Sequence, residues 1–237
     1  MNESTTRAPH GDERSALDEL RQEPGSRAQF LKMVGGVGAA GALSVLIAAC
    51  GGDDEESTSG SGSSSSGSSS SGGGASKQDI EIVNYALTLE YLEADFYQQV
   101  LDSGEVKDKK VGEVAMEFAE NEQEHVAALM ATVEKLGGKP AAKPTTNFDS
   151  VLEGGEKVIL ETAATVENLG AAAYLGQAGR IKSKEILAAA LSIHTIEARH
   201  AAVLNSVVGK SIVPDGAFAK PAAMAEVLMA VKPFIKS

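Results

Sequence analysis

Residues 86–97 read ALTLEYLEADFY, and residues 163–174 read AATVENLGAAAY. When Glu90 is aligned with Glu167, the two stretches agree at six of twelve positions. The agreement includes the glutamate itself and a tyrosine seven residues further on, which lies about two helical turns away on the same side. The chain therefore contains an internal repeat, and the repeat is the strongest indication of its fold.

A Glu-x-x-His motif follows each copy of the repeat at a similar distance. Glu122 and His125 follow the first copy, and Glu197 and His200 follow the second. Residues three apart on an α-helix lie on one face, so the two side chains of each motif can point at the same place. Four packed helices would bring four carboxylates and two imidazoles into one interior. Because so many buried charges are costly unless they are neutralised, we expect two cations among them.

Apolar residues recur at helical spacing after residue 77, and only 4% of the chain is aromatic. A Pro-containing segment at 139–149 is the longest connection that the pattern predicts, and Asp149 or Ser150 can cap the helix after it. The sequence predicts an all-α four-helix bundle with one long crossover between the second and third helices and a short C-terminal helix. The expected helices cover about 78–102, 110–136, 150–178, 182–208 and 221–231.

These features resemble the ferritin-like superfamily, and most closely the exported bacterial ferritin-like domain family. LEYLEA at 89–94 and EARHAA at 197–202 carry the resemblance, which covers roughly residues 77–237. It implies a four-helix bundle with a di-metal carboxylate site, to which two helices give a Glu and two more give a Glu-x-x-His. The metal ligands that it implies are Glu90, Glu122, His125, Glu167, Glu197 and His200.

Four further residues lie close to the implied ligands in the pattern. Glu93 comes three residues after Glu90 and could face the same site, as an additional Glu does in rubrerythrin-like proteins; otherwise it is a surface acid or one that supports a ligand. Tyr97 and Tyr174 occupy equivalent positions, and we expect each hydroxyl to bond and orient a buried carboxylate. His194 lies one turn before the second Glu-x-x-His motif, and we expect it to support a ligand rather than to bind metal.

We expect iron rather than manganese. A ligand set of two imidazoles and otherwise oxygen atoms suits iron or manganese better than copper or zinc. The resemblance implies two iron ions that take up Fe(II) and react with dioxygen or peroxide, in iron handling or oxidant defence. Two alternatives remain open. The bundle could be a non-enzymatic stress-related or binding module, because fold does not fix function. It could also carry manganese catalase-like chemistry.

The N-terminal part of the chain predicts export. Residues 1–50 combine a polar leader, an apolar core at 33–49 and an Ile-Ala-Ala-Cys ending, which resembles a bacterial lipobox with Cys50 as the lipid-bearing residue. An uncleaved membrane helix is the alternative. The segment at 26–32 resembles a twin-arginine motif, but Ala28 occupies the place of the second arginine. Residues 51–76 are rich in Ser and Gly and predict a disordered linker. We therefore expect an extracytoplasmic protein, anchored by lipid to the bacterial membrane.

Charge and cysteine content exclude several classes of protein. The chain carries 33 acidic residues against 21 Lys and Arg, a formal net charge of −12, which argues against nucleic acid as a partner. The single cysteine excludes an internal disulfide and a rubredoxin-type iron centre. A lipid on every chain would hamper a closed shell, so we expect a monomer or a dimer.

Overall fold

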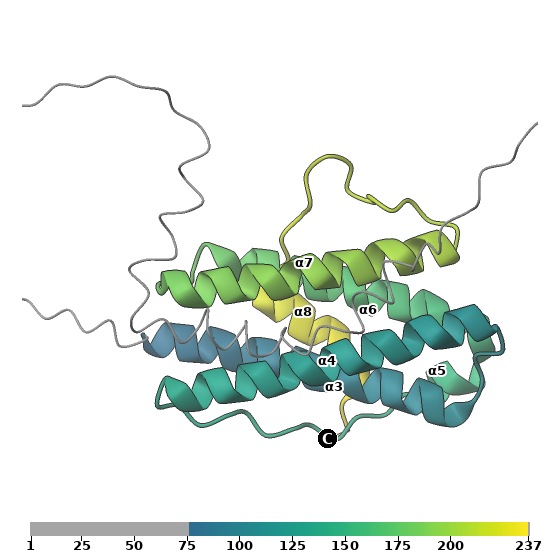
Figure 1. Cartoon of the computed structure of the whole chain (residues 1–237), viewed down its shortest axis with the longest axis horizontal. Helices are drawn as coiled ribbons and strands as arrows, with labels where there is room; N and C mark the ends of the chain where they lie inside the picture. Colours follow the sequence, from purple (N-terminus) through teal and green to yellow (C-terminus); the bar gives the residue numbers. More distant parts are fainter. Residues whose placement is uncertain (1–75, 237) are drawn as a thin grey trace, which may run out of the picture.

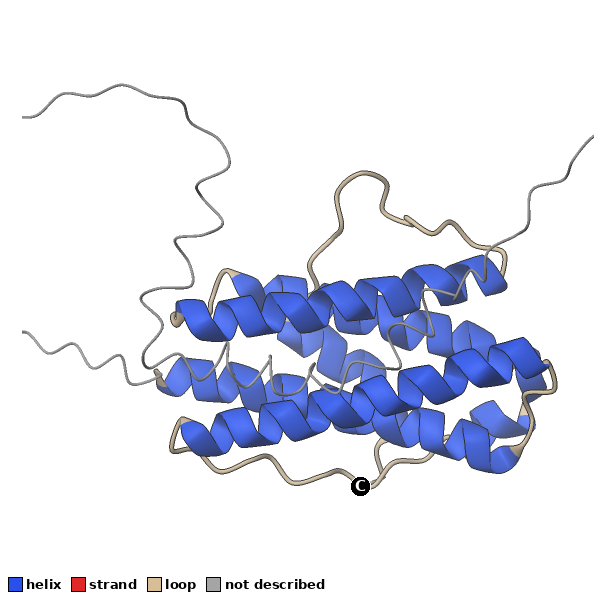
Figure 2. Ribbon diagram, viewed as in Figure 1, coloured by secondary structure: helices blue, strands red, loops and turns tan. Residues whose placement is uncertain are grey.

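The computed structural model describes residues 76–236, and over this range it consists of helices and the loops that join them (Figure 1; Figure 2). Residues 1–75, which include Cys50, the predicted leader and all of the predicted linker except Ser76, lie outside the described residues. No strand occurs between residues 76 and 236, and no helix in that range is long and apolar enough to cross a membrane. The predicted all-α bundle is confirmed. The helices are α3 (Lys77–Ser103), α4 (Lys109–Lys135), α5 (Asp149–Glu153), α6 (Gly155–Ala178), α7 (Lys184–Val207), α8 (Met224–Val231) and the 3₁₀ helix η1 (Lys232–Phe234).

The long helices begin and end at residues with local signals. The side chains of Ser76, Asp108 and Ser183 accept hydrogen bonds from the first-turn amides of α3, α4 and α7. Gly104 ends α3 in the left-handed conformation, which glycine adopts without steric cost. Because these signals lie within a few residues of the helix ends, the predicted bounds of these three helices are close to those observed.

The helices form two hairpins that pack into one bundle. α3 packs mainly against α4, and α6 mainly against α7, and a few contacts join α3 to α6 (Figure 1). The crossover between the hairpins, residues 136–148, is fastened to α3 at both ends. Asn84 bonds the backbone of Lys139 and Ala141, and the Thr146 hydroxyl donates to Asp95. The crossover also pairs with the chain end through an isolated antiparallel bridge between Thr146 and Ile235.

Three details of the predicted fold are wrong. The helix expected at 150–178 is broken into α5 and α6, because Gly155 has a φ of 74°, which is outside the helical region. Neither Asp149 nor Ser150 is the cap, since Phe148 occupies that position and gives no side-chain bond. The connection at 208–223 is longer than the crossover, although the pattern predicts the crossover to be the longest connection, and it stands away from the bundle in Figure 1. The last helix starts at Met224 rather than at 221.

The apolar core consists of two clusters. One cluster draws on the C-terminal half of α3 and the N-terminal halves of α4 and α6, and it includes Phe96 and Ile159. The other draws mainly on the N-terminal halves of α3 and α7 and the C-terminal half of α4, and it includes Leu87 and Ile186. The first cluster lies mainly toward one end of the bundle and the second toward the other, although Tyr85, Leu89 and Ala173 of the first lie at the level of the second. Buried charged residues occupy the level of the helices between them.

Candidate metal centre

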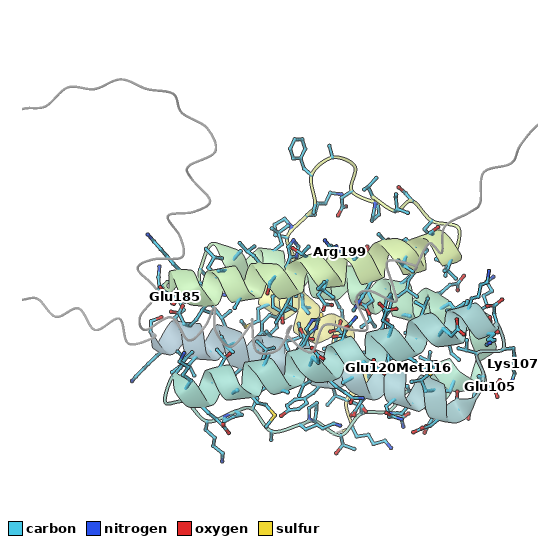
Figure 3. The ribbon with its side chains drawn as sticks, viewed as in Figure 1. Glu105, Lys107, Met116, Glu120, Glu185 and Arg199 are labelled. Carbon is cyan, nitrogen blue, oxygen red and sulfur yellow. The ribbon has the colours of Figure 1, made fainter. Side chains whose placement is uncertain are left out.

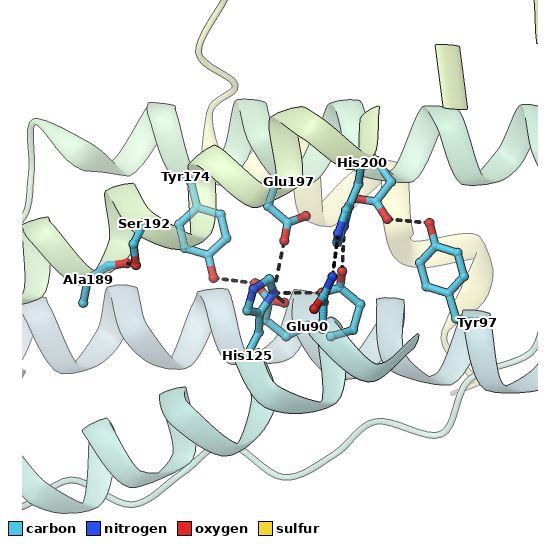
Figure 4. A network of polar contacts seen from close by, with 11 residues as sticks. Glu90, Tyr97, His125, Tyr174, Ala189, Ser192, Glu197 and His200 are labelled. Carbon is cyan, nitrogen blue, oxygen red and sulfur yellow. Dashed lines mark hydrogen bonds and ion pairs between the residues drawn. The ribbon is translucent and has the colours of Figure 1, made fainter. Parts of the chain in front are cut away.

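The structure brings together the six residues that the sequence singled out. The four long helices direct their side chains into the same part of the interior (Figure 4). All four glutamates have an exposed fraction of 0%, while His200 is buried and His125 is partly buried. The six residues are Glu90 from α3, Glu122 and His125 from α4, Glu167 from α6, and Glu197 and His200 from α7.

The six side chains form two overlapping groups of four. One contains Glu90 and His125, the other contains Glu167 and His200, and both contain Glu122 and Glu197. Within each group, one ligand atom from every residue lies within 4.8 Å of the others. Each group could hold a metal ion, and Glu122 and Glu197 belong to both groups.

His125 lies at the centre of the first group. Its Nδ1 atom is 3.1 Å from Glu90 Oε2, 3.1 Å from Glu122 Oε2 and 3.2 Å from Glu197 Oε1. Three helices therefore contribute a carboxylate to one imidazole nitrogen (Figure 4). A single nitrogen cannot donate one proton to three acceptors, so the arrangement satisfies these oxygens only in part.

His200 occupies the equivalent place in the second group and is fixed from two sides. Its Nδ1 atom is 3.0 Å from Glu122 Oε1 and 3.3 Å from Glu167 Oε2. Its Nε2 atom lies 3.2 Å from the side-chain amide of Asn121, and its ring stacks on Phe118 at 3.8 Å between centroids. Sequence reasoning missed Asn121 and Phe118. Both are in α4 close to the Glu-x-x-His motif, but no residue pattern marks them as contacts of a histidine in α7.

The two tyrosines bond carboxylates reciprocally across the bundle. The Tyr97 hydroxyl of α3 donates to Glu167 of α6, and the Tyr174 hydroxyl of α6 donates to Glu90 of α3 (Figure 4). Burial, and then the charge of the partner carboxylate, raise the pKa of both phenols well above the usual value. Each hydroxyl therefore keeps its proton, and each carboxylate has one oxygen fixed while the other faces a histidine.

Glu93 lies inside the bundle with an exposed fraction of 2%, so a surface position is wrong for this residue. Its carboxylate occupies space that the missing side chain of Gly170 leaves open. A Cβ atom on Gly170 would come within 2.8 Å of Glu93 Oε1 and 2.9 Å of Glu197 Oε2. Glu93 belongs to neither group of four, but it adds a fifth carboxylate beside Glu197. The glycine that stands at the equivalent position of the second repeat thus accommodates the additional acid.

Three other polar residues that lie close to the Glu-x-x-His motifs in sequence belong to neither group of four. His194 places its Nδ1 atom 3.0 Å from the carbonyl oxygen of Ala171 and belongs to neither group. Glu120, close to Glu122 in sequence, lies on the exposed outer face of α4, and Arg199, next to His200, is exposed on α7 (Figure 3). On α4 and α7, the charged residues that point into the bundle are therefore distinct from those that point into solvent.

Burial raises the pKa of most of the carboxyl groups. Desolvation, opposed by His125, raises the pKa of Glu90 to about 7. Burial and neighbouring carboxylates raise the pKa of Glu93 and of Glu197 well above 4.5, and burial raises that of Glu167 as well. Glu122 is the exception. Burial opposes its ionisation too, but the two histidines outweigh that effect and its pKa falls below the usual value.

The same charges act on the histidines. Burial alone would lower the pKa of His125, but Glu90 and Glu122 raise it well above 6.5. His200 is similar, because its close contacts with the carboxylates of Glu122 and Glu167 outweigh burial and raise its pKa to about 9. In metal-free protein, protons therefore supply the positive charge that the carboxylates need.

Several atoms of the cluster have no hydrogen-bond partner among the described residues. Cations held by these atoms would satisfy them, since carboxylate oxygens and imidazole nitrogens are the ligands of di-iron and di-manganese sites. The residues present therefore fit two divalent or trivalent ions. The atoms without a hydrogen bond are Oε1 of Glu122, Oε2 of Glu167, both carboxylate oxygens of Glu197, Oε2 of Glu93 and Nδ1 of His200.

Comparison with known proteins agrees with the fold. The family model described as "Ferritin-like domain" matches residues 78–210, which include all six predicted ligands. The chain belongs to this family of ferritin-like domains. No curated protein matches the chain.

Metal-free protein should lose stability as the pH rises from about 5 to about 9. Glu90 holds its proton to about pH 7 when folded, against an ordinary pKa of 4.5, and His200 holds its proton to about pH 9, against 6.5. Both pKa values are raised by folding, so the stability that each group contributes at low pH is lost as the pH passes through these intervals. The loss should be on the order of 3 kcal/mol for each group. Folding lowers the pKa of Glu122, so the stability that its ionised form contributes is present above about pH 4.5 and is lost only below that pH.

Denaturant unfolding at pH 5, 7 and 9, followed by circular dichroism, measures this trend. Glu90→Gln removes one titrating group and should flatten the decline between pH 5 and 7. A free energy of unfolding that stays constant or increases from pH 5 to 9 would contradict the electrostatic description of the cluster.

Proposed function

We propose that this protein is an exported, lipid-anchored ferritin-like protein that binds two iron ions and reacts with dioxygen or peroxide, in iron handling or oxidant defence. The observation that carries the proposal is the sharing of Glu122 and Glu197 by two buried groups of ligands. A structural site for one ion would need four ligands, whereas this cluster offers two sets of four. Manganese, which favours similar oxygen-rich ligands, is the alternative metal.

Each residue of the cluster has a distinct part in the proposed site. Glu90 and His125 would hold one ion, Glu167 and His200 the other, and Glu122 and Glu197 both. Bound iron would supply one-electron redox chemistry toward dioxygen or peroxide. The Tyr97 and Tyr174 hydroxyls would keep Glu167 and Glu90 oriented, since a ligand carboxylate fixed by a hydrogen bond binds metal more tightly.

Glu93 supports a redox role more than a purely structural one. Its carboxylate lies against Glu197, and its Oε2 atom has no hydrogen-bond partner among the described residues. A site that only stabilised the fold would gain nothing from a fifth buried acid, whose desolvation is costly. At a redox site, an additional carboxylate can compensate a change in the charge of the ions or hold a proton.

The first test is the number of iron ions bound. Protein saturated with Fe(II) under anaerobic conditions and then desalted should retain about two iron atoms per chain by elemental analysis. Glu122→Ala should retain almost none, because it removes a ligand from both groups, whereas Glu167→Ala should retain about one. Glu120→Ala is the matched control, since Glu120 is an exposed glutamate of the same helix, and it should bind as the wild type does. Equal iron content in wild type and Glu122→Ala would contradict the site.

The second test separates a catalyst from a binding module. Iron-loaded wild type, given excess ascorbate to supply the two electrons that reduce each peroxide to water, should consume hydrogen peroxide at least roughly 100-fold faster than the Glu90→Ala/His200→Ala double variant, because that variant removes one ligand from each ion. Peroxide loss is followed by absorbance, and a dissolved-oxygen electrode distinguishes reduction from the oxygen-evolving, catalase-like reaction. Equal rates in the two proteins would favour the non-enzymatic module on the same scaffold.

The proposed location is supported by the sequence of residues 1–76 alone. The lipobox-like ending at Cys50, followed by a Ser/Gly-rich segment, would place the bundle outside the cell on a flexible tether. In a bacterial host given a radiolabelled fatty acid, the full chain should take up label and sediment with membranes. Cys50→Ala should abolish the labelling. Labelling that persists in Cys50→Ala would disprove this attachment.

A further inference from the structure

One end of the bundle contains a cavity of about 140 Å³. It lies where α3 ends and α4 begins, and it extends between the N-terminal half of α6 and the C-terminal half of α7. Its inner walls come from buried side chains that include Phe96, Val100 and Ile159. At the rim lie exposed Lys110, the one charged residue of the lining, and Val207, with an exposed fraction of 46%.

The cavity adjoins the candidate metal centre. Two of its lining residues are Tyr97, which bonds Glu167, and Phe118, whose ring stacks on His200. A molecule in the cavity would therefore be separated from the second group of ligands by a single layer of aromatic rings. The Tyr97 hydroxyl is already bonded to a carboxylate, so the inner wall presents an apolar surface to an occupant.

The internal repeat allows the two ends of the bundle to be compared. The pocket at the opposite end is lined by equivalent residues, such as Ala86 for Ala163 and Leu129 for Leu204, and Tyr174 takes the place of Tyr97. Its volume is only about 20 Å³. Equivalent helix positions therefore pack closely at one end and leave a space at the other, so the larger cavity does not follow from the bundle geometry.

A cavity of this size and lining selects one class of occupant. A closed apolar cavity of about 150 Å³ stays dry and takes up benzene or xenon, because water would lose its hydrogen bonds there. The cavity described above is similar in volume and lining but opens to solvent at its rim, so an apolar molecule would displace poorly bonded water from it. The described lining offers aliphatic and aromatic surface and no unpaired inner polar group for a charged ligand. We propose that this cavity binds a small, uncharged apolar molecule of about the size of benzene, next to the Phe118–His200 pair. Binding depends on the cavity and not on the proposed iron chemistry, so metal-free and metal-loaded protein should behave alike.

Benzene titration followed by methyl NMR tests the proposal on the full chain. The methyl resonances of Leu204, which lines the cavity, should shift in a saturable way. Those of Leu129, its equivalent at the narrow end, should stay unchanged. This pair of probes reports on the bundle alone, so association of benzene with the apolar segment at 33–49 does not interfere. Crystals under xenon pressure should show xenon in the same cavity.

Filling the cavity should weaken binding. Ala163→Leu from α6 and Ala115→Leu from α4 each extend a buried lining residue into the space, and each should weaken benzene binding roughly tenfold or more. Ala188→Leu, at an exposed position of α7, is the control and should bind as the wild type does. Absence of a saturable Leu204 shift, or equal shifts of Leu204 and Leu129, would overturn the proposal. Normal iron binding in the filled variants would show that the metal site is separate from it.

Discussion

Five carboxylates buried in one helical interior are the constraint on which the rest of this structure depends. Glu90, Glu122, Glu167 and Glu197 are fully buried, and Glu93 is nearly so. Isolated buried charges of this number would unfold a domain whose net stability is of order 10 kcal/mol. The structure compensates them with two histidines, two phenol hydroxyls and raised carboxyl pKa values, yet several oxygens keep no hydrogen bond. Bound cations would satisfy them, which supports the proposed metal site.

The internal repeat explains the arrangement of these groups. Each repeat contributes a Glu, a Tyr and a Glu-x-x-His, and each tyrosine orients the glutamate of the other repeat. The two repeats therefore depend on each other, because neither can satisfy its own buried carboxylate alone. Departures from the repeat are equally informative. Gly170 stands opposite Glu93 in the alignment, and its missing side chain leaves room for the fifth acid. The unequal cavities at the two ends are a second departure.

The sequence predicts the helices and the convergence of the six side chains because both depend on local spacing. Caps such as Ser76, Asp108 and Ser183 lie next to the helix ends they define, and positions seven or three apart share a helix face whatever surrounds them. The break between α5 and α6 was missed, because helices often tolerate glycine and only the structure shows the positive φ of Gly155. Contacts between residues on helices that are distant in sequence do not follow from local spacing either.

Glu93 and Phe118 illustrate that limit. Spacing alone puts Glu93 near the face of Glu90, but its burial depends on the absence of a side chain on another helix. Phe118 reads as an ordinary core residue of α4, and its stacking on His200 depends on how α4 and α7 pack. The cavity beside it arises from the combined packing of four helices. Properties of this kind come from side-chain volumes across the bundle rather than from a pattern along one helix.

The proposed metal site depends on two ions sharing Glu122 and Glu197. Anomalous diffraction at the iron absorption edge, from crystals grown with Fe(II), tests this most directly. The proposed site should give two neighbouring anomalous peaks. One should lie beside Glu90 and His125 and the other beside Glu167 and His200, with Glu122 and Glu197 beside both. A single peak in the interior, or peaks only at exposed acids such as Glu120, would contradict it.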